Sequence, residues 1–201
     1  MSVSKTTTVN KALTLCGAAP VSAITDDTNN ARVVDRVYEI ARKSILSECL
    51  WTFAATRTTL ATTAASLAWN YDDETYVYVR PTAALKIFEV NPDTAIWREE
   101  GANIITDTSS LGIKFVYDHD DPSLYPAYFL EAFIDKLCVD ISYMIINSVT
   151  KAEAFLSKYQ KISLPNAKSS NSQIGKQQDP IDDAWEIAKL MNGGNPARSY
   201  Q

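Results

Sequence analysis

The chain has 201 residues, of which 46% are hydrophobic and 21% are charged, and its formal net charge at pH 7 is −5. This apolar content is enough for a folded core, so a largely disordered chain is excluded. The net negative charge argues against a protein that mainly neutralises nucleic-acid phosphates, because that task needs clustered Lys and Arg. An isolated DNA-binding module is therefore disfavoured.

Apolar runs, cysteines and histidine exclude further classes. No run approaches the roughly 18 apolar residues that a membrane span needs, and the N-terminus is too polar for a secretory signal, so we expect a soluble intracellular protein. Cys16, Cys49 and Cys138 form no CxxC motif, which favours reduced, mostly buried thiols over disulfides or a zinc site. A single histidine, His119, excludes a multi-histidine metal site, and we expect it in a solvated turn.

Helical spacing predicts two helices near the N-terminus. In the first, Val9 and Leu13 lie on one stripe, and Gly17 ends the helix. Thr28 caps the second, longer helix, which carries two apolar stripes and so predicts burial on two sides. One stripe contains Ala31, Val34, Tyr38, Ala41 and Ile45, and the other contains Val33, Val37 and Ile40.

Between residues 74 and 117 the apolar pattern changes to period two, which is typical of β-strands. Turn residues, such as Asn91-Pro92-Asp93 and Ser109-Ser110, divide this stretch into about five short strands. Their connections are too short for parallel crossovers, so we expect an antiparallel meander. The predicted strands cover residues 75–80, 85–90, 96–99, 103–106 and 113–117.

After an acidic turn over residues 118–126, helical spacing returns. An apolar stripe from Phe129 to Tyr159 predicts one long helix of about thirty residues, bent near residues 147–150. Residues 164–180 have the composition of a linker. Asp179 as N-cap and Pro180 at the first helical position then begin a short amphipathic helix.

Together these elements predict an α+β fold: a helical bundle interrupted by a small antiparallel β domain, with an extended C-terminal arm that ends in a short helix. The arm helix either docks onto another chain or folds back onto its own bundle, and the sequence leaves both open. The predicted segments are residues 1–68 for the N-terminal bundle helices, 69–118 for the β insertion, 119–163 for the long C-terminal bundle helix, and 164–201 for the polar linker and arm helix.

Carboxylates form three clusters: Asp26-Asp27, Asp72-Asp73-Glu74, and Asp118 with Asp120-Asp121. Paired carboxylates hydrolyse glycosides when a cleft holds them roughly 5–10 Å apart. All three clusters lie at element boundaries, where Asp caps helices and favours turns, so structural roles are favoured. No serine or cysteine lies in a nucleophile motif such as GxSxG. We expect no catalytic residue, no metal ligand and no cofactor, and no enzymatic activity.

A series of short motifs over about residues 9–160 resembles one family. ALTLCG is followed by ITDDTNNARVVDRVYEIARKSILSECLWTFAATRTTLA, and then by YVYVRPTAALKIFEV, IWREEGANIITD and FVYDHDDPSLYPAYFLEAFIDKLCVDIS. In order and spacing these runs are similar to the podophage head-to-tail adaptors called tail tubular protein A, which are related to the small adaptors of other short-tailed phages. The matching positions include Tyr38, Trp51 and Arg57.

The resemblance implies a structural virion protein, assembled in the host cytoplasm, that forms a dodecameric ring beneath the portal protein. Such a ring docks the tail nozzle protein and lets genomic DNA pass without specific binding or membrane contact. An acidic ring repels DNA phosphates, which suits passage. The alternative is an adaptor with additional peptidoglycan-hydrolase activity.

Three sets of residues are the candidate contacts of such a ring. Val33, Val37 and Ile40 are expected at the subunit interface, and Asn91, Asp93, Asp107 and Ser109 in loops on the tail side. The portal-binding arm candidates are Ile174, Ile181, Trp185, Ala188 and Met191. We expect a chain without residues 165–201 to fold and to lose portal binding.

Overall fold

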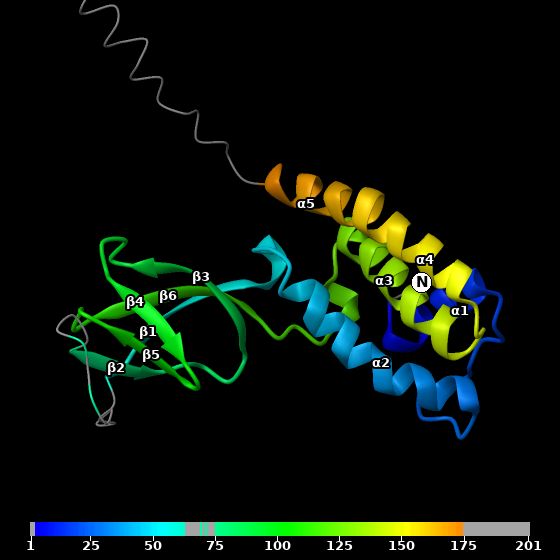
Figure 1. Cartoon of the computed structure of the whole chain (residues 1–201), viewed down its shortest axis with the longest axis horizontal. Helices are drawn as coiled ribbons and strands as arrows, with labels where there is room; N and C mark the ends of the chain where they lie inside the picture. Colours follow the sequence, from blue (N-terminus) through cyan, green and yellow to red (C-terminus); the bar gives the residue numbers. More distant parts are fainter. Residues whose placement is uncertain (1–2, 63–68, 70, 72–74, 175–201) are drawn as a thin grey trace, which may run out of the picture.

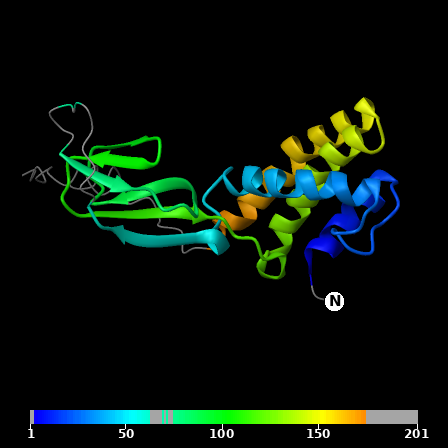
Figure 2. The same cartoon turned by 90° about the horizontal axis from the view of Figure 1, so that it is seen from below.

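The computed structural model describes residues 3–62, 69, 71 and 75–174. The molecule is elongated, with a helical bundle at one end and a β domain at the other (Figure 1), and a perpendicular view shows the same two parts (Figure 2). The predicted α+β fold, a bundle interrupted by antiparallel β structure, is confirmed. The predicted arm helix lies outside the described residues.

Both N-terminal helices form as predicted. Helix α1 (Lys5–Cys16) begins at a capping box on Ser4 and ends at Gly17, whose φ of +82° is the left-handed conformation that glycine adopts most readily. Helix α2 (Asn29–Leu46) begins at Thr28, whose hydroxyl accepts from the backbone N–H of Ala31 at 3.2 Å.

The single long helix predicted from Phe129 to Tyr159, within the segment 119–163, is wrong, because the chain reverses near residue 147, where only a bend was expected. Helix α3 (Ala127–Met144) ends before Asn147, which has a φ of +52°, and Ser148 then caps helix α4 (Val149–Lys158). Asparagine tolerates the left-handed conformation that such a reversal needs. Helix α4 therefore packs back along α3 (Figures 1 and 2).

The linker predicted from residue 164 onward is also wrong over its first part. A π turn (Tyr159–Ser163) joins α4 to helix α5 (Leu164–Ser172). Pro165 lies in the first turn of α5, where its missing N–H is tolerated, and the widened turn before it makes room for its ring. Because Ala167 is buried in the bundle core, removal of residues 165–201 would remove part of that core.

Asn171 holds α5 against the segment that follows α2. Its Oδ1 accepts from the backbone N–H of Thr52 at 2.9 Å, and its Nδ2 donates to the carbonyl of Leu50 at 2.9 Å. We expect Asn171→Ala to lower the free energy of unfolding by about 1–3 kcal/mol in a urea titration, because these backbone groups lose their partners. Asn166→Ala, at an exposed position of α5, should change it by less than about 0.5 kcal/mol. Equal effects would contradict this role of Asn171.

Six strands form two three-stranded antiparallel sheets, with orders β1-β6-β3 and β2-β5-β4. The five predicted strands are confirmed. The predicted meander is wrong, because β6 lies between β1 and β3, which are distant from it in sequence. The unpredicted strand β1 pairs with β6, so the boundary predicted after residue 68 is also wrong. The bounds are β1 (Ala55–Leu60), β2 (Tyr76–Val79), β3 (Ala84–Asn91), β4 (Trp97–Glu100), β5 (Asn103–Thr106) and β6 (Leu111–Tyr117).

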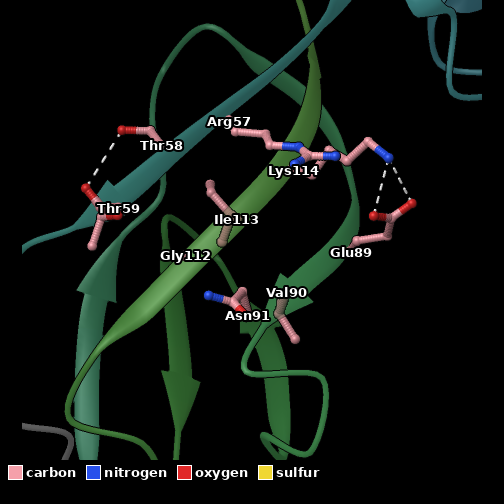
Figure 3. A pocket seen from close by; sticks show the side chains of 9 residues that line it. All are labelled: Arg57, Thr58, Thr59, Glu89, Val90, Asn91, Gly112, Ile113 and Lys114. Carbon is pink, nitrogen blue, oxygen red and sulfur yellow. Dashed lines mark hydrogen bonds and ion pairs between the residues drawn. The ribbon is translucent and has the colours of Figure 1, made fainter.

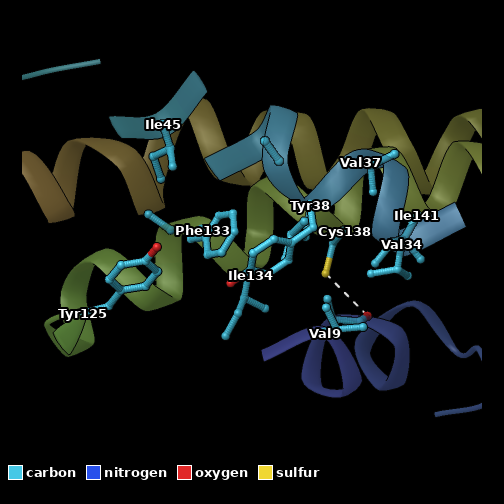
Figure 4. Close-up of a cluster of buried hydrophobic side chains, with 14 of the residues drawn as sticks. Val9, Val34, Val37, Tyr38, Ile45, Tyr125, Phe133, Ile134, Cys138 and Ile141 are labelled. Carbon is cyan, nitrogen blue, oxygen red and sulfur yellow. Dashed lines mark hydrogen bonds between the residues drawn. The ribbon is translucent and has the colours of Figure 1, made fainter. Parts of the chain in front are cut away.

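Each part of the molecule has its own hydrophobic core. In the bundle, the rings of Tyr38 and Phe133 meet edge to face at 5.2 Å, and Cys138 Sγ donates to the carbonyl of Ala12 at 3.6 Å (Figure 4). Trp51, fully buried, donates its ring N–H to the carbonyl of Ile45 at 2.8 Å. The core of the β domain is separate and consists of Tyr78, Ala84, Ile87, Ile104, Leu111, Ile113 and Phe115.

Candidate interaction surfaces

A buried arginine joins the bundle to the β domain. The Arg42 side chain, on α2, is only 3% exposed and forms ion pairs with Glu39 and, at 2.7 Å, with Asp118 immediately after β6. Lys43 also contacts Asp118, at 3.3 Å, and Lys5 of α1 contacts Glu39 at 3.1 Å. This cluster fixes the end of β6 against two helices.

The electrostatics of the cluster favour the ionised carboxylate of Glu39. Burial acts to raise the pKa of Glu39, but hydrogen bonds from Arg42 and Lys5 outweigh burial and hold the pKa below its ordinary value of 4.5. The cluster is therefore a charged network that depends on pH in the acidic range.

His119, beside this cluster, does not lie in a solvated turn as predicted. It is 5% exposed, and its ring lies among those of Tyr117, Phe53 and Tyr125, with centroids 5.0–5.9 Å away. The hydroxyl of Tyr125 donates to the carbonyl of His119 at 2.7 Å. The residue thus belongs to the packing between the two parts of the molecule.

The four tail-side candidates, Asn91, Asp93, Asp107 and Ser109, are all exposed and lie together. Asn91 ends β3 opposite Gly112 at the start of β6, whereas the other end of this pair lies next to the bundle, so these loops mark the remote end of the β domain. Asp107 connects the loop after β5 to the loop after β3, because its Oδ1 accepts a hydrogen bond from the N–H of Ile96 at 3.1 Å. Its own N–H donates to the carbonyl of Ile96 at 3.3 Å.

An exposed aromatic pair, Trp69 and Tyr71, lies beside β4, which carries Arg98. The rings of Trp69 and Tyr71 are 4.9 Å apart, and the guanidinium of Arg98 lies 4.6 Å from the ring of Tyr71. Trp69 is 67% exposed and Ile96 57%. Trp69 is not among the residues singled out from the sequence. Two large aromatic residues next to Asp72-Asp73-Glu74 were the signal that could have marked a surface site.

The β1-β6-β3 sheet carries a shallow hollow of about 590 Å³ (Figure 3). Gly112 lies at the bottom of this hollow, and a side chain there would contact Asn91. At its rim, Lys114 Nζ binds both carboxylate oxygens of Glu89, at 2.8 and 3.0 Å. Thr59 and other hydrogen-bonding groups complete the lining, which suits a polar protein surface.

The three interface candidates on α2 differ in how far their side chains are exposed. Val37 is 5% exposed and packs in the core of its own chain, so its assignment to a subunit interface is wrong. Val33 is half-buried. Ile40 is 72% exposed, and it alone of the three offers a free apolar side chain.

Several described carboxylates of the predicted clusters make structural contacts. Asp26 accepts from the backbone N–H groups of Ser22 and Ala23 at 2.9 and 2.8 Å. Asp121 accepts from the N–H of Ser123 at 2.9 Å, and hydrogen bonds from that residue lower the pKa of Asp121. The cluster Asp72-Asp73-Glu74 lies outside the described residues. Over the described ranges, no three His, Cys, Asp or Glu side chains are grouped as metal ligands.

The cysteines are free thiols, two buried and one half-buried, as predicted. A hydrogen bond with Cys138 lowers the pKa of Cys16, while this pairing and burial raise the pKa of Cys138. Burial also raises the pKa of Cys49 to about 11. Because Cys16 is fully buried, its lowered pKa does not make it an accessible nucleophile.

Among the portal-binding candidates, Ile174 ends the described chain and is 58% exposed. Ile181, Trp185, Ala188 and Met191 lie outside the described residues. No protein-family model matches the chain, and a search of curated proteins finds no match either. The part of the chain that the structure describes contains no helix that is both long and apolar enough to cross a membrane.

Proposed function

We propose that this protein is a structural component of a phage virion, a ring-shaped head-to-tail adaptor. The ring docks under the portal protein, connects it to the tail nozzle protein and lines the channel through which DNA leaves. The observation that carries this proposal is the ordered series of motifs over residues 9–160 that resembles the tail tubular protein A adaptors.

The arrangement of the surfaces supports a ring with two docking faces. Ile40 projects from α2 as an exposed apolar side chain, suited to a head-to-tail contact with a neighbouring copy that closes by rotation. The loops carrying Asn91 and Asp107 lie at the far end of the β domain and serve as the tail side. The net charge of −5 per copy, repeated around a ring, disfavours tight contact with DNA phosphates.

Truncation after Ile174 tests the arm as the portal-binding element. Because α5 is part of the bundle, this truncation keeps the fold whereas a truncation at residue 165 would not. We expect the truncated chain to remain folded, with a cooperative melting transition, and to lose co-sedimentation with purified portal rings. Full-length Gln177→Ala serves as the control and should bind like the natural chain.

Two outcomes distinguish a failure of the arm's proposed role from a failure of the adaptor function. Co-sedimentation of the truncated chain at the level of the full chain would remove the arm from the proposal and leave the adaptor function standing. A full-length chain that does not co-sediment with portal rings at micromolar concentration would contradict the adaptor function itself.

A further inference from the structure

An open groove runs along the bundle between α1 and the continuous helix formed by α4, the π turn and α5. It consists of two hollows of about 430 and 290 Å³, which adjoin because Leu15 and Lys158 line both. Phe155 and Ile162 continue the apolar lining. Leu15 is 49% exposed and Ile162 54%, so the groove leaves apolar side chains uncovered.

Three lysines and two carboxylates line the groove, an excess of one basic group. Lys158 is neutralised by Asp135, whose Oδ1 lies 2.8 Å from its Nζ. Lys151 donates to the carbonyl of Cys16, a neutral partner, at 3.2 Å. Lys11 lines the same hollow as Glu131 and Asp135. The groove therefore suits an apolar helix with acidic flanks.

The chain itself supplies such a helix next to the groove. Residues 175–201 follow α5, whose Asn166 and Ser170 form one wall. The sequence predicts a helix over residues 180–191, with four acids and one lysine over residues 179–191. Its apolar face consists of Ile181, Ala184, Trp185, Ala188 and Met191.

The groove is long enough to hold the helix. At 1.5 Å per residue, a helix over residues 180–191 is about 18 Å long, and the groove wall from Ala154 to Ser170 is about 26 Å long. Residues 175–179 are enough to reverse the chain, since antiparallel helices are commonly joined by 2–5 residues. An antiparallel helix would place its acidic first turn in the hollow that contains Lys11.

We propose that this groove binds residues 179–191 of the same chain, with the Trp185 face covering Leu15 and Ile162. The helix completes the bundle and shields its own apolar face. This binding describes the free subunit, before the arm reaches a portal, so it is tested without portal or ring and its failure is distinguishable from a failure of the adaptor function.

Hydrogen–deuterium exchange of the full-length chain tests this binding. We expect amides of residues 181–191 to exchange at least tenfold more slowly in the natural chain than in Leu15→Asp. Leu124→Asp is the matched control, because Leu124 is 61% exposed on the turn before α3 and lies outside the groove. Equal exchange of this segment in all three proteins would overturn the proposal.

A cross-link identifies the occupant even if Leu15→Asp perturbs the bundle. In Ile162→Cys/Trp185→Cys, mild oxidation should give a disulfide within one chain, detected by mass spectrometry at a yield independent of protein concentration. The pair Leu124→Cys/Trp185→Cys should give none. Cross-linked dimers alone would overturn the proposal, because a second copy would then occupy the groove.

Discussion

Replacing Arg42 with methionine is expected to lower the free energy of unfolding by about 3 kcal/mol. Removing one partner of a buried ion pair costs roughly 3–5 kcal/mol. The lower end applies here because Asp118 is 24% exposed and keeps its contact with Lys43. Urea titration at pH 7 measures the change.

Lys43→Met is the matched control, since it removes the other cation that contacts Asp118. The Lys43 side chain is 51% exposed, so its loss should cost less than about 1 kcal/mol. If the two variants lose the same stability, Arg42 does not join the two parts of the molecule in the way described.

The stability of the Arg42→Met variant should also depend on pH differently from that of the natural chain. The folded-state pKa of Glu39 lies below its ordinary value of 4.5, so its contribution to stability is present above pH 4.5 and is lost as the pH falls through the folded-state pKa. The natural chain should therefore lose stability more steeply below pH 4.5 than Arg42→Met. Parallel stability curves would contradict this coupling.

Replacing Ile40 with glutamate is expected to abolish ring formation on the portal while leaving the subunit folded. The side chain is 72% exposed, so the free energy of unfolding should change by no more than about 0.5 kcal/mol. In a closed ring the same position would bury an unpaired carboxylate, which costs far more than an apolar contact returns. Negative-stain electron microscopy of portal rings mixed with the variant measures assembly.

Leu124→Glu controls for a general effect of added charge. It places a carboxylate at another exposed apolar position, 61% exposed, away from α2. Rings should form normally with this variant. Complete rings with Ile40→Glu would exclude α2 as the subunit contact.

The sequence predicted those elements whose pattern is local. Helices α1 and α2 and strands β2 to β6 show clear apolar periods with turn residues between them. Strand β1 was missed because its residues 57–59 are all exposed, so no alternation of apolar residues marks it. Helix α5 was missed for a related reason: its polar composition hides contacts, such as those of Asn171, that only the folded chain brings together.

The residues of the candidate surfaces, too, could be predicted only where a local sequence pattern marks them. Asn91 and Asp107 were correctly placed at strand ends because turn residues mark such ends, and the sheet register brings those ends together. Val37 was misassigned because helical spacing shows that a residue is buried but not which chain buries it. The pairing of Arg42 with Asp118 could not be predicted, because it joins residues far apart in sequence through the packing of two domains.

The most direct test of the adaptor proposal is native mass spectrometry of the full-length protein, alone and mixed with purified portal rings. We expect a monomer in isolation and, with the portal, one complex whose added mass corresponds to a closed ring of copies. A portal mass that stays unchanged, or that gains only single copies without closing a ring, would contradict the proposal.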